Sequence, residues 1–318
     1  MHLIESYAHM HLFAGSSHPA LSESLAKELD SPLGRVMLKR FASGECYVKY
    51  EQSVRGQDVY LLQSTGINPH DALFELFLLC QAAKLSFASS IHVILPYFSY
   101  ARQDRVSEPR EPISAKLMAQ LLEEAGADHV ITLNLHSDQI QGFFSVPVDV
   151  LDARPIFARY FETKNIKNPI VVSPDIGGAK QAKKFADHLG AELAIMHKVR
   201  TGHHQAEIME VVGDVEGRTC ILYDDMIDTA GTLISAKETL KKRGAGSDVY
   251  VAATHAVFSG PAIERLTSAG FVEVVVSDSL PISADFKGLT VLPIAPLLAE
   301  VIHHIERRES VTDIYRKK

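Results

Sequence analysis

Two neighbouring acids, Asp224 and Asp225, follow the apolar run 220–223 and precede a group of short residues at 228–232, which we call the phosphate loop. The apolar run is typical of a buried strand, and a helical pattern begins at Leu233. A strand, a tight turn and a helix N-terminus bind phosphate, because unpaired N–H groups and the positive end of the helix dipole face the anion. The phosphate loop consists of Asp228, Thr229, Ala230, Gly231 and Thr232, which are short enough to let a phosphate reach the backbone.

The carboxylates of Asp224 and Asp225 suit the other end of a sugar phosphate, where they would accept hydrogen bonds from ribose hydroxyls or hold Mg²⁺ through water. Acids and glycine also form ordinary turns. The whole string resembles the phosphoribosyl-pyrophosphate (PRPP) loop of the type I phosphoribosyltransferase fold. The sequence has neither the phosphate-loop signature of nucleotide kinases nor a G-x-G-x-x-G after a strand.

Composition indicates a protein with a large core. The chain has 318 residues, of which 46% are hydrophobic, so it can bury two domains. Its net charge is −7 with acids and bases mixed throughout, which argues against nucleic acid as a partner. The three cysteines have no metal-type or disulfide-type spacing. We expect no membrane span and a cytoplasmic location, because no apolar stretch is long enough to cross a bilayer.

Strand-like and helix-like segments alternate along both halves of the chain. This alternation predicts an α/β fold with two parallel-sheet domains, residues 1–149 and 150–318. Strands are expected at 10–14, 36–41, 46–50, 59–63, 91–95, 130–135, 170–173, 192–197, 220–223, 250–255, 273–277 and 292–294, and helices at 19–29, 71–86, 112–125, 153–161, 179–189, from 233, and at 261–269.

Polar clusters follow several of these strands. In open α/β sheets, ligands bind beyond the carboxyl ends of the strands. The clusters at 99–105, 135–139, 173–178 and 198–200, together with the acids and the phosphate loop, therefore predict one or more ligand sites at those ends.

The chain resembles the ribose-phosphate pyrophosphokinase family from about residue 41 to 314. In that family, two halves of the type I phosphoribosyltransferase-like fold form each subunit. The resemblance places ATP-binding segments in 1–149 and the ribose 5-phosphate loop in 150–318. It is carried by the motifs at 41–45, 53–56, 100–105, 110–113, 139–144, 173–175, 254–255 and 259–262, by His136, Lys198 and Arg200, and by the string 224–232.

The resemblance implies that ATP and ribose 5-phosphate give PRPP and AMP, with Mg²⁺ as cofactor. The implied catalytic residues are Lys198 and Arg200, and the implied metal ligands are His136 and Asp175. ATP would contact Phe41, Ser43, Gly44, Glu45, Arg102 and Gln103. Ribose 5-phosphate would contact Arg200, Asp224, Asp225 and the phosphate loop.

Two of these assignments have further consequences. Lys198 and Arg200 would lie on one side of an extended segment, where two cations can neutralise a triphosphate. In the family, the segment 41–45 reaches the active site of a neighbouring subunit. The resemblance therefore implies a homodimer or homohexamer.

The chain also departs from the family pattern. Ser43, Asn134 and Ser145 stand where the family usually has aspartate, which leaves the nucleotide and cation preferences open. Residues 106–109 replace a basic segment of the phosphate-activated members. We expect weaker phosphate activation and weaker ADP inhibition, because an anion site built from those cations is weakened.

Two other functions use the same features. A phosphoribosyltransferase would share the phosphate loop, but it would not need Lys198 or the pair Arg102–Gln103. A non-catalytic regulatory homologue would be expected to lack the catalytic lysine or the metal ligands, and this chain retains them.

Overall fold

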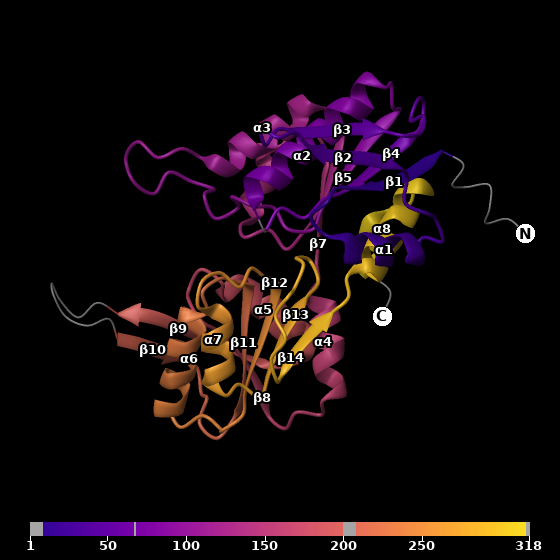
Figure 1. Cartoon of the computed structure of the whole chain (residues 1–318). Coiled ribbons are helices and arrows are strands. Elements are labelled where there is room, and N and C mark those ends of the chain that lie inside the picture. The colour runs from indigo at the N-terminus through magenta and orange to yellow at the C-terminus, as the bar shows by residue number, and fades with distance from the viewer. Residues whose placement is uncertain (1–8, 67, 200–207, 316–318) are drawn as a thin grey trace, which may run out of the picture. The chain divides into compact units, whose positions relative to one another are not determined.

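The computed structural model describes residues 9–66, 68–199 and 208–315, and the chain divides into two compact units (Figure 1). Unit 1 comprises Met1–Leu151, Ser279–Pro281 and Pro293–Lys318, and unit 2 comprises Asp152–Asp278 and Ile282–Leu292. Each unit holds a sheet of mainly parallel strands with helices between them in sequence. The predicted α/β fold class is therefore confirmed.

Unit 1 is built on a five-stranded sheet with the order β1-β4-β5-β6-β7, in which every pairing is parallel. Residues such as Val59, Leu61 and Val93 point to one face, where they form a core with α2 and α3. On the other face, the Tyr60 hydroxyl donates to Glu306 of α8 at 2.8 Å. The elements are β1 (Met10–Ala14), α1 (Pro19–Glu28), β4 (Asp58–Leu62), α2 (Pro69–Leu85), β5 (Ser90–Leu95), α3 (Ser114–Ala125), β6 (His129–Leu133), the 3-10 helix η1 (Asp138–Phe143), β7 (Val148–Leu151), α8 (Ala295–Glu306) and the 3-10 helix η2 (Val311–Tyr315).

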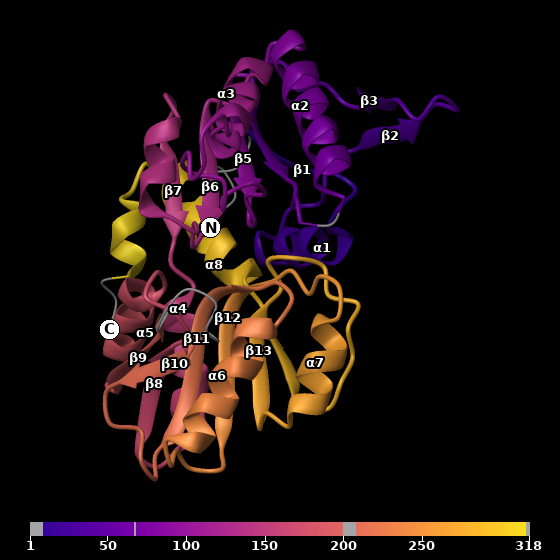
Figure 2. The same cartoon turned by 90° about the vertical axis from the view of Figure 1, so that its left-hand side faces the viewer.

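An antiparallel hairpin of β2 (Val36–Arg40) and β3 (Cys46–Tyr50) lies between β1 and β4 in sequence. Its base is fixed because the Tyr50 hydroxyl donates to the Leu79 carbonyl of α2 at 3.0 Å. Figure 2 shows the hairpin extending away from the five-stranded sheet. The tip at 41–45 joins the two strands that the sequence predicted at 36–41 and 46–50, and it contains four of the residues expected to contact ATP.

Unit 2 is built on a seven-stranded sheet with the order β10-β9-β8-β11-β12-β13-β14. Helices α6 and α7 cover one face through an aliphatic core. On the other face, Phe161 of α4 contacts Phe185 of α5, which stacks on Tyr223 with ring centroids 4.6 Å apart. The elements are α4 (Arg154–Thr163), β8 (Pro169–Ser173), α5 (Ala179–Leu189), β9 (Glu192–Val199), β10 (Ile208–Val212), β11 (Thr219–Ile227), α6 (Gly231–Lys242), β12 (Val249–Ala256), α7 (Ala262–Ala269), β13 (Glu273–Ser277) and β14 (Leu289–Leu292).

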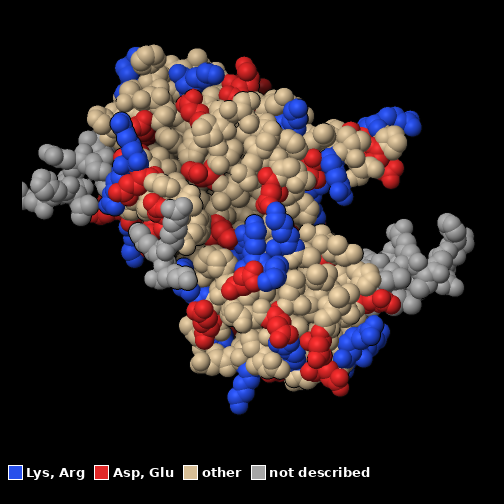
Figure 3. All heavy atoms as spheres, turned by 180° about the vertical axis from the view of Figure 1, so that it is seen from behind, with Lys and Arg blue, Asp and Glu red and all other residues tan. Residues whose placement is uncertain are grey.

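Acidic and basic side chains are interspersed on the face drawn in Figure 3. Among the helices that the structure describes, none is both long and apolar enough to cross a bilayer.

The two units repeat one topology. In each, a first strand is followed by a helix and an antiparallel strand pair, and then by four further parallel strands, so that β1 corresponds to β8 and β7 to β14. The helix after each last strand packs in the other unit: α4 follows β7 and packs on α5, whereas α8 follows β14 and packs on α1. Unit 1 therefore includes the end of the chain, which differs from the two uninterrupted domains that the sequence predicted.

We expect α8 to contribute to the stability of unit 1 as a core helix. Ile302 of α8 is fully buried, so Ile302→Ala should lower the free energy of unfolding by about 2–5 kcal/mol. Urea denaturation measures the change. The control is Ile263→Ala on α7, where the side chain is 38% exposed, and it should cost far less. Equal effects of the two substitutions would contradict a core role for α8.

Candidate active site

The acids lie on a strand that is paired unequally on its two sides. β11 pairs with β12 from Cys220 as far as Ile227, but it pairs with β8 only as far as Leu222. Asp224 and Asp225 are therefore inside β11, whereas the sequence placed them after a strand that ended at 223; the expected end of that strand was wrong. On the other side of β11, β8 ends at Ser173, and the turn 174–178 follows it.

This turn brings Asp175 close to Asp224. The Asp175 carboxylate accepts a hydrogen bond from the Gly178 N–H at 2.7 Å, and the Ser173 hydroxyl donates to the Asp175 carbonyl at 2.7 Å. A methyl group on Gly178 would lie 3.5 Å from Asp175 Oδ1 and 3.9 Å from Asp224 Oδ1. The carboxylates of Asp175 and Asp224 therefore border the same small space around Gly178.

Electrostatic repulsion is concentrated in this space. Burial raises the pKa of Asp224 well above its usual range, and the charges of Asp225 and Asp175 raise it further. The Asp225 N–H opposes this effect in part, because it donates to Asp224 Oδ1 at 2.9 Å. A cation placed among these carboxylates would relieve the repulsion.

The carboxylates fit Mg²⁺ as a ligand set. Mg²⁺ is usually held by one or two carboxylates together with substrate phosphates and water. Among the described residues, no group of three or more His, Cys, Asp or Glu side chains is arranged to hold a metal alone. A Mg²⁺ ion at Asp175 and Asp224 would therefore need water or substrate oxygens to complete its coordination.

The phosphate loop has the strand–turn–helix geometry that the sequence predicted. Helix α6 begins at Gly231, two residues before the expected start, and Ala230 precedes it with φ 61° in the left-handed region. The first N–H groups of a helix have no partner within it, and they face whatever lies beyond its N-terminus. Hydrogen bonds from the segment after β12 hold the start of the loop: the N–H groups of Phe258 and Ser259 donate to the carbonyls of Ile227 and Asp228 at 2.9 and 3.0 Å.

The segment 41–45, which is predicted to contact ATP, forms the exposed tip of the β2–β3 hairpin. Phe41 is 55% exposed, and its ring meets the edge of Tyr47 with centroids 5.7 Å apart. The Ser43 hydroxyl donates to a Glu45 carboxylate oxygen at 2.8 Å. Gly44 has φ 93°, which a residue with a side chain rarely adopts, and this allows the tight turn. The ring of Phe41 and the carboxylate of Glu45 are thus presented outward.

Arg102 and Gln103 follow β5 and are exposed. The side-chain oxygen of Gln103 accepts from the Ser114 hydroxyl at 2.6 Å, and its carbonyl accepts from the Ala115 N–H at 3.2 Å. Gln103 is therefore attached to the start of α3, which holds the neighbouring Arg102 at the carboxyl end of the unit 1 sheet.

His136 lies three residues after β6 and is exposed. Asn134, which stands where the family usually has aspartate, has φ 30°, and its N–H donates to the Leu151 carbonyl at 3.0 Å. Asn adopts positive φ more readily than most residues, so it fits this position. His136 belongs to unit 1 and Asp175 to unit 2, so the two predicted metal ligands come from different units.

The predicted catalytic pair is only partly described. Lys198 lies within β9, which continues beyond the expected end at 197, and its backbone is opposite Met209 of β10. The sequence did not predict β10. Arg200 lies outside the described residues.

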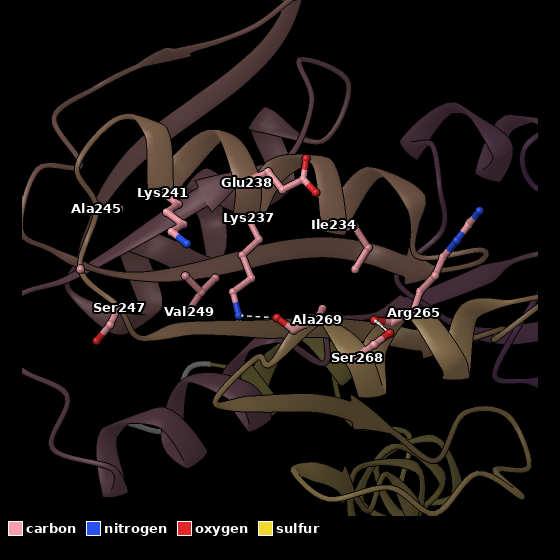
Figure 4. A pocket seen from close by; sticks show the side chains of 11 residues that line it. Ile234, Lys237, Glu238, Lys241, Ala245, Ser247, Val249, Arg265, Ser268 and Ala269 are labelled. Carbon is pink, nitrogen blue, oxygen red and sulfur yellow. Dashed lines mark hydrogen bonds between the residues drawn. The ribbon is translucent and has the colours of Figure 1, made fainter.

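Sequence reasoning did not assign roles to Ser173, Gly178, Phe258 or Ser259, which shape the acids' surroundings and the phosphate loop. The motifs 173–178 and 259–262 had marked two of these segments, but their contacts depend on neighbours distant in sequence. A cavity of about 640 Å³ between α6 and α7 contains none of the predicted site residues. Figure 4 shows its lining, which includes Lys237, Lys241 and Arg265.

The sequence matches two protein-family descriptions and many known relatives. Residues 10–126 match the family "N-terminal domain of ribose phosphate pyrophosphokinase", and residues 201–316 match the "phosphoribosyl synthetase-associated domain". The ribose-phosphate pyrophosphokinase of Helicobacter hepaticus is 47% identical over 304 residues, covering 96% of this chain and 98% of the relative. The chain belongs to the ribose-phosphate pyrophosphokinase family.

Two further proteins match the chain over nearly its whole length. The ribose-phosphate pyrophosphokinase of Synechococcus elongatus is 47% identical over 311 residues, covering 96% of this chain and 94% of the relative. The crystal structure of phosphoribosylpyrophosphate synthetase from Mycobacterium smegmatis superposes with a TM-score of 0.89 at 44% identity, covering 94% of this chain and 99% of that one. Both units therefore have the fold of this family.

We expect Asp224 to destabilise the ligand-free protein at neutral pH. The pKa of Asp224 is higher in the folded protein than in the unfolded chain, where it is about 3.9. The folded protein is therefore at its full stability below about pH 3.9, and it loses stability as the pH rises towards the folded-state pKa. Asp224→Asn should therefore be more stable than the wild type at pH 7, by about 1.4 kcal/mol for each unit of pKa shift, and the difference should vanish near pH 4.

Urea denaturation without divalent cations at the two pH values measures this difference. The matched control is Asp248→Asn, an exposed aspartate just before β12, which should leave stability nearly unchanged at both. If the Asp224→Asn protein is no more stable than the wild type at pH 7, the charged Asp224 carboxylate does not destabilise the folded protein.

Proposed function

We propose that this chain is a ribose-phosphate diphosphokinase, which transfers the diphosphoryl group of ATP to the anomeric hydroxyl of ribose 5-phosphate. The hydroxyl oxygen bonds to the β-phosphorus, the bond from that phosphorus to the bridging oxygen breaks, AMP leaves with that oxygen, and the hydroxyl proton passes to solvent. The observation that carries the proposal is the strand of acids followed by the phosphate loop in a chain 47% identical to ribose-phosphate pyrophosphokinases.

The two ends of the sugar match the two ends of this motif. The N–H groups of the phosphate loop hold the 5-phosphate, aided by the α6 dipole. Asp224 and Asp225, which shortly precede the loop, accept hydrogen bonds from the ribose hydroxyls. This orientation directs the anomeric hydroxyl away from the loop, towards the ATP phosphates.

ATP is bound by residues of unit 1. Phe41 stacks on the adenine, Ser43, Gly44 and Glu45 supply polar contacts, and Arg102 and Gln103 contact the nucleotide. Because Phe41 stands exposed at the tip of a hairpin, we propose that it enters the site of a second copy of this chain, in a homodimer or homohexamer.

Lys198 and Arg200 neutralise the triphosphate as charge moves towards the departing AMP. Asp175 and His136 would hold Mg²⁺, with Asp224 beside Asp175, and the ion would neutralise phosphate charge. We propose a cytoplasmic location, since Cys46, Cys80 and Cys220 are free thiols, as expected in a reducing compartment.

Removal of the Lys198 charge should abolish catalysis. With ATP, Mg²⁺ and ribose 5-phosphate, the wild type should form AMP, and Lys198→Ala should form it at least about 100-fold more slowly, because a cation acting on the transition state is lost. The control is Lys183→Ala, which removes an exposed lysine paired with Asp187 on α5. An unchanged rate in the Lys198→Ala protein, with circular dichroism showing an intact fold, would remove Lys198 from the catalytic residues.

We also expect activity to depend little on inorganic phosphate. In the segment 106–109, the N–H groups of Ser107 and Glu108 donate to the Glu111 carboxylate at 3.0 and 2.8 Å, so these two donors already bind an anionic group of the protein itself. The initial rate should change little as phosphate is added, and ADP should inhibit by competing with ATP. A rate that requires phosphate in the millimolar range would contradict this expectation.

A further inference from the structure

Arg265 of α7 contacts the backbone of the phosphate loop. Its Nη1 donates to the Thr229 carbonyl at 2.9 Å. The same nitrogen is 3.4 Å from the position that a Cβ on Gly231 would occupy. The guanidinium therefore lies directly against the loop, although nothing in the proposed reaction requires it to touch the sugar.

Three successive backbone carbonyls, those of residues 227–229, accept hydrogen bonds from one segment of the chain. The carbonyls of Ile227 and Asp228 accept from the N–H groups of Phe258 and Ser259, and the next carbonyl, that of Thr229, accepts from Arg265. All three donors belong to the segment 258–265. Backbone donors serve the first two carbonyls, and only the third depends on a side chain.

Holding a carbonyl also orients the next N–H. In a planar trans peptide, the C=O of one residue and the N–H of the next point in opposite directions. Fixing the Thr229 carbonyl on the side of α7 therefore directs the Ala230 N–H to the other side. Ala230 has φ 61°, a conformation that residues with a side chain rarely adopt, so the surroundings must hold it there.

Arg265 differs in this respect from the other cations near it. Figure 4 shows Arg265 extending away from the cavity that Lys237 and Lys241 line. The Lys237 ammonium donates to the Ala269 carbonyl at 2.7 Å and so caps the end of α7. Lys237 therefore has a structural role in helix packing, whereas Arg265 contacts the loop.

We propose that Arg265 is a positioning residue that holds the phosphate loop in the conformation that receives the 5-phosphate of ribose 5-phosphate. The proposal rests on the proposed function, which assigns that phosphate to residues 228–232. The planar guanidinium suits the task because its donors have fixed directions, whereas a lysine ammonium offers a single mobile point of contact.

Steady-state kinetics of Arg265→Gln test the proposal. We expect the KM for ribose 5-phosphate to rise about tenfold, equivalent to about 1.4 kcal/mol, with the KM for ATP unchanged and a smaller fall in kcat. Arg265→Lys should recover part of the loss, because an ammonium can still donate to the Thr229 carbonyl. A KM for ribose 5-phosphate equal to that of the wild type in the Arg265→Gln protein overturns the proposal.

The matched control is Arg218→Gln. Arg218 also donates to a backbone carbonyl, that of Pro169 at 3.0 Å, but Pro169 is the first residue of β8 and so lies at the amino end of that strand. This substitution should lower stability without changing either KM. Equal rises in both KM values for the Arg265→Gln and Arg218→Gln proteins would indicate general loosening and would overturn a specific role for Arg265.

Calorimetric titration with ribose 5-phosphate separates this proposal from the proposed function. A wild type that forms no AMP refutes the diphosphokinase activity, yet its binding of ribose 5-phosphate can still be measured. About tenfold weaker binding by the Arg265→Gln protein supports the role of Arg265. Equal binding by both proteins, or no binding by the wild type, overturns it.

Discussion

β11 is paired as far as Ile227 on one side and only as far as Leu222 on the other, and the arrangement of the candidate site depends on this inequality. Where β8 stops, the turn 174–178 brings Asp175 beside Asp224. Where β12 continues, it keeps the acids extended until the chain reaches the phosphate loop. One strand end therefore carries a cluster of negative charge followed, within a few residues, by N–H groups that attract negative charge.

This arrangement is complementary to a ligand with hydroxyls or a cation at one end and phosphate at the other. It is costly for the protein alone, because burial and two neighbouring carboxylates raise the pKa of Asp224. It also holds Ala230 in a backbone conformation that is rare for its residue type. Such local conflicts are common at functional sites, where the rest of the fold holds groups ready for a ligand.

The sequence was sufficient to predict the alternation of strands and helices, because buried parallel strands are short apolar runs that end at Gly, Pro or polar clusters. It was not sufficient for Asp224 and Asp225, since acids seldom lie inside a strand and the early end of β8 depends on a distant segment. It missed α8, which begins between Pro293 and Pro296, where prolines are typical of loops as well as of helix starts. It also missed Arg265, whose bond to Thr229 spans 36 residues.

Because α8 follows unit 2 in sequence but packs in unit 1, it affects the order in which the protein can fold during synthesis. The sheet of unit 1 is complete once β7 has been synthesised, but α8, which packs on α1, follows all of unit 2 in the sequence. While unit 2 is translated, the surface of unit 1 that α8 later covers therefore stays exposed. Domains usually fold in the order of synthesis, but α8 can complete the packing of unit 1 only after the strands of unit 2 have been made.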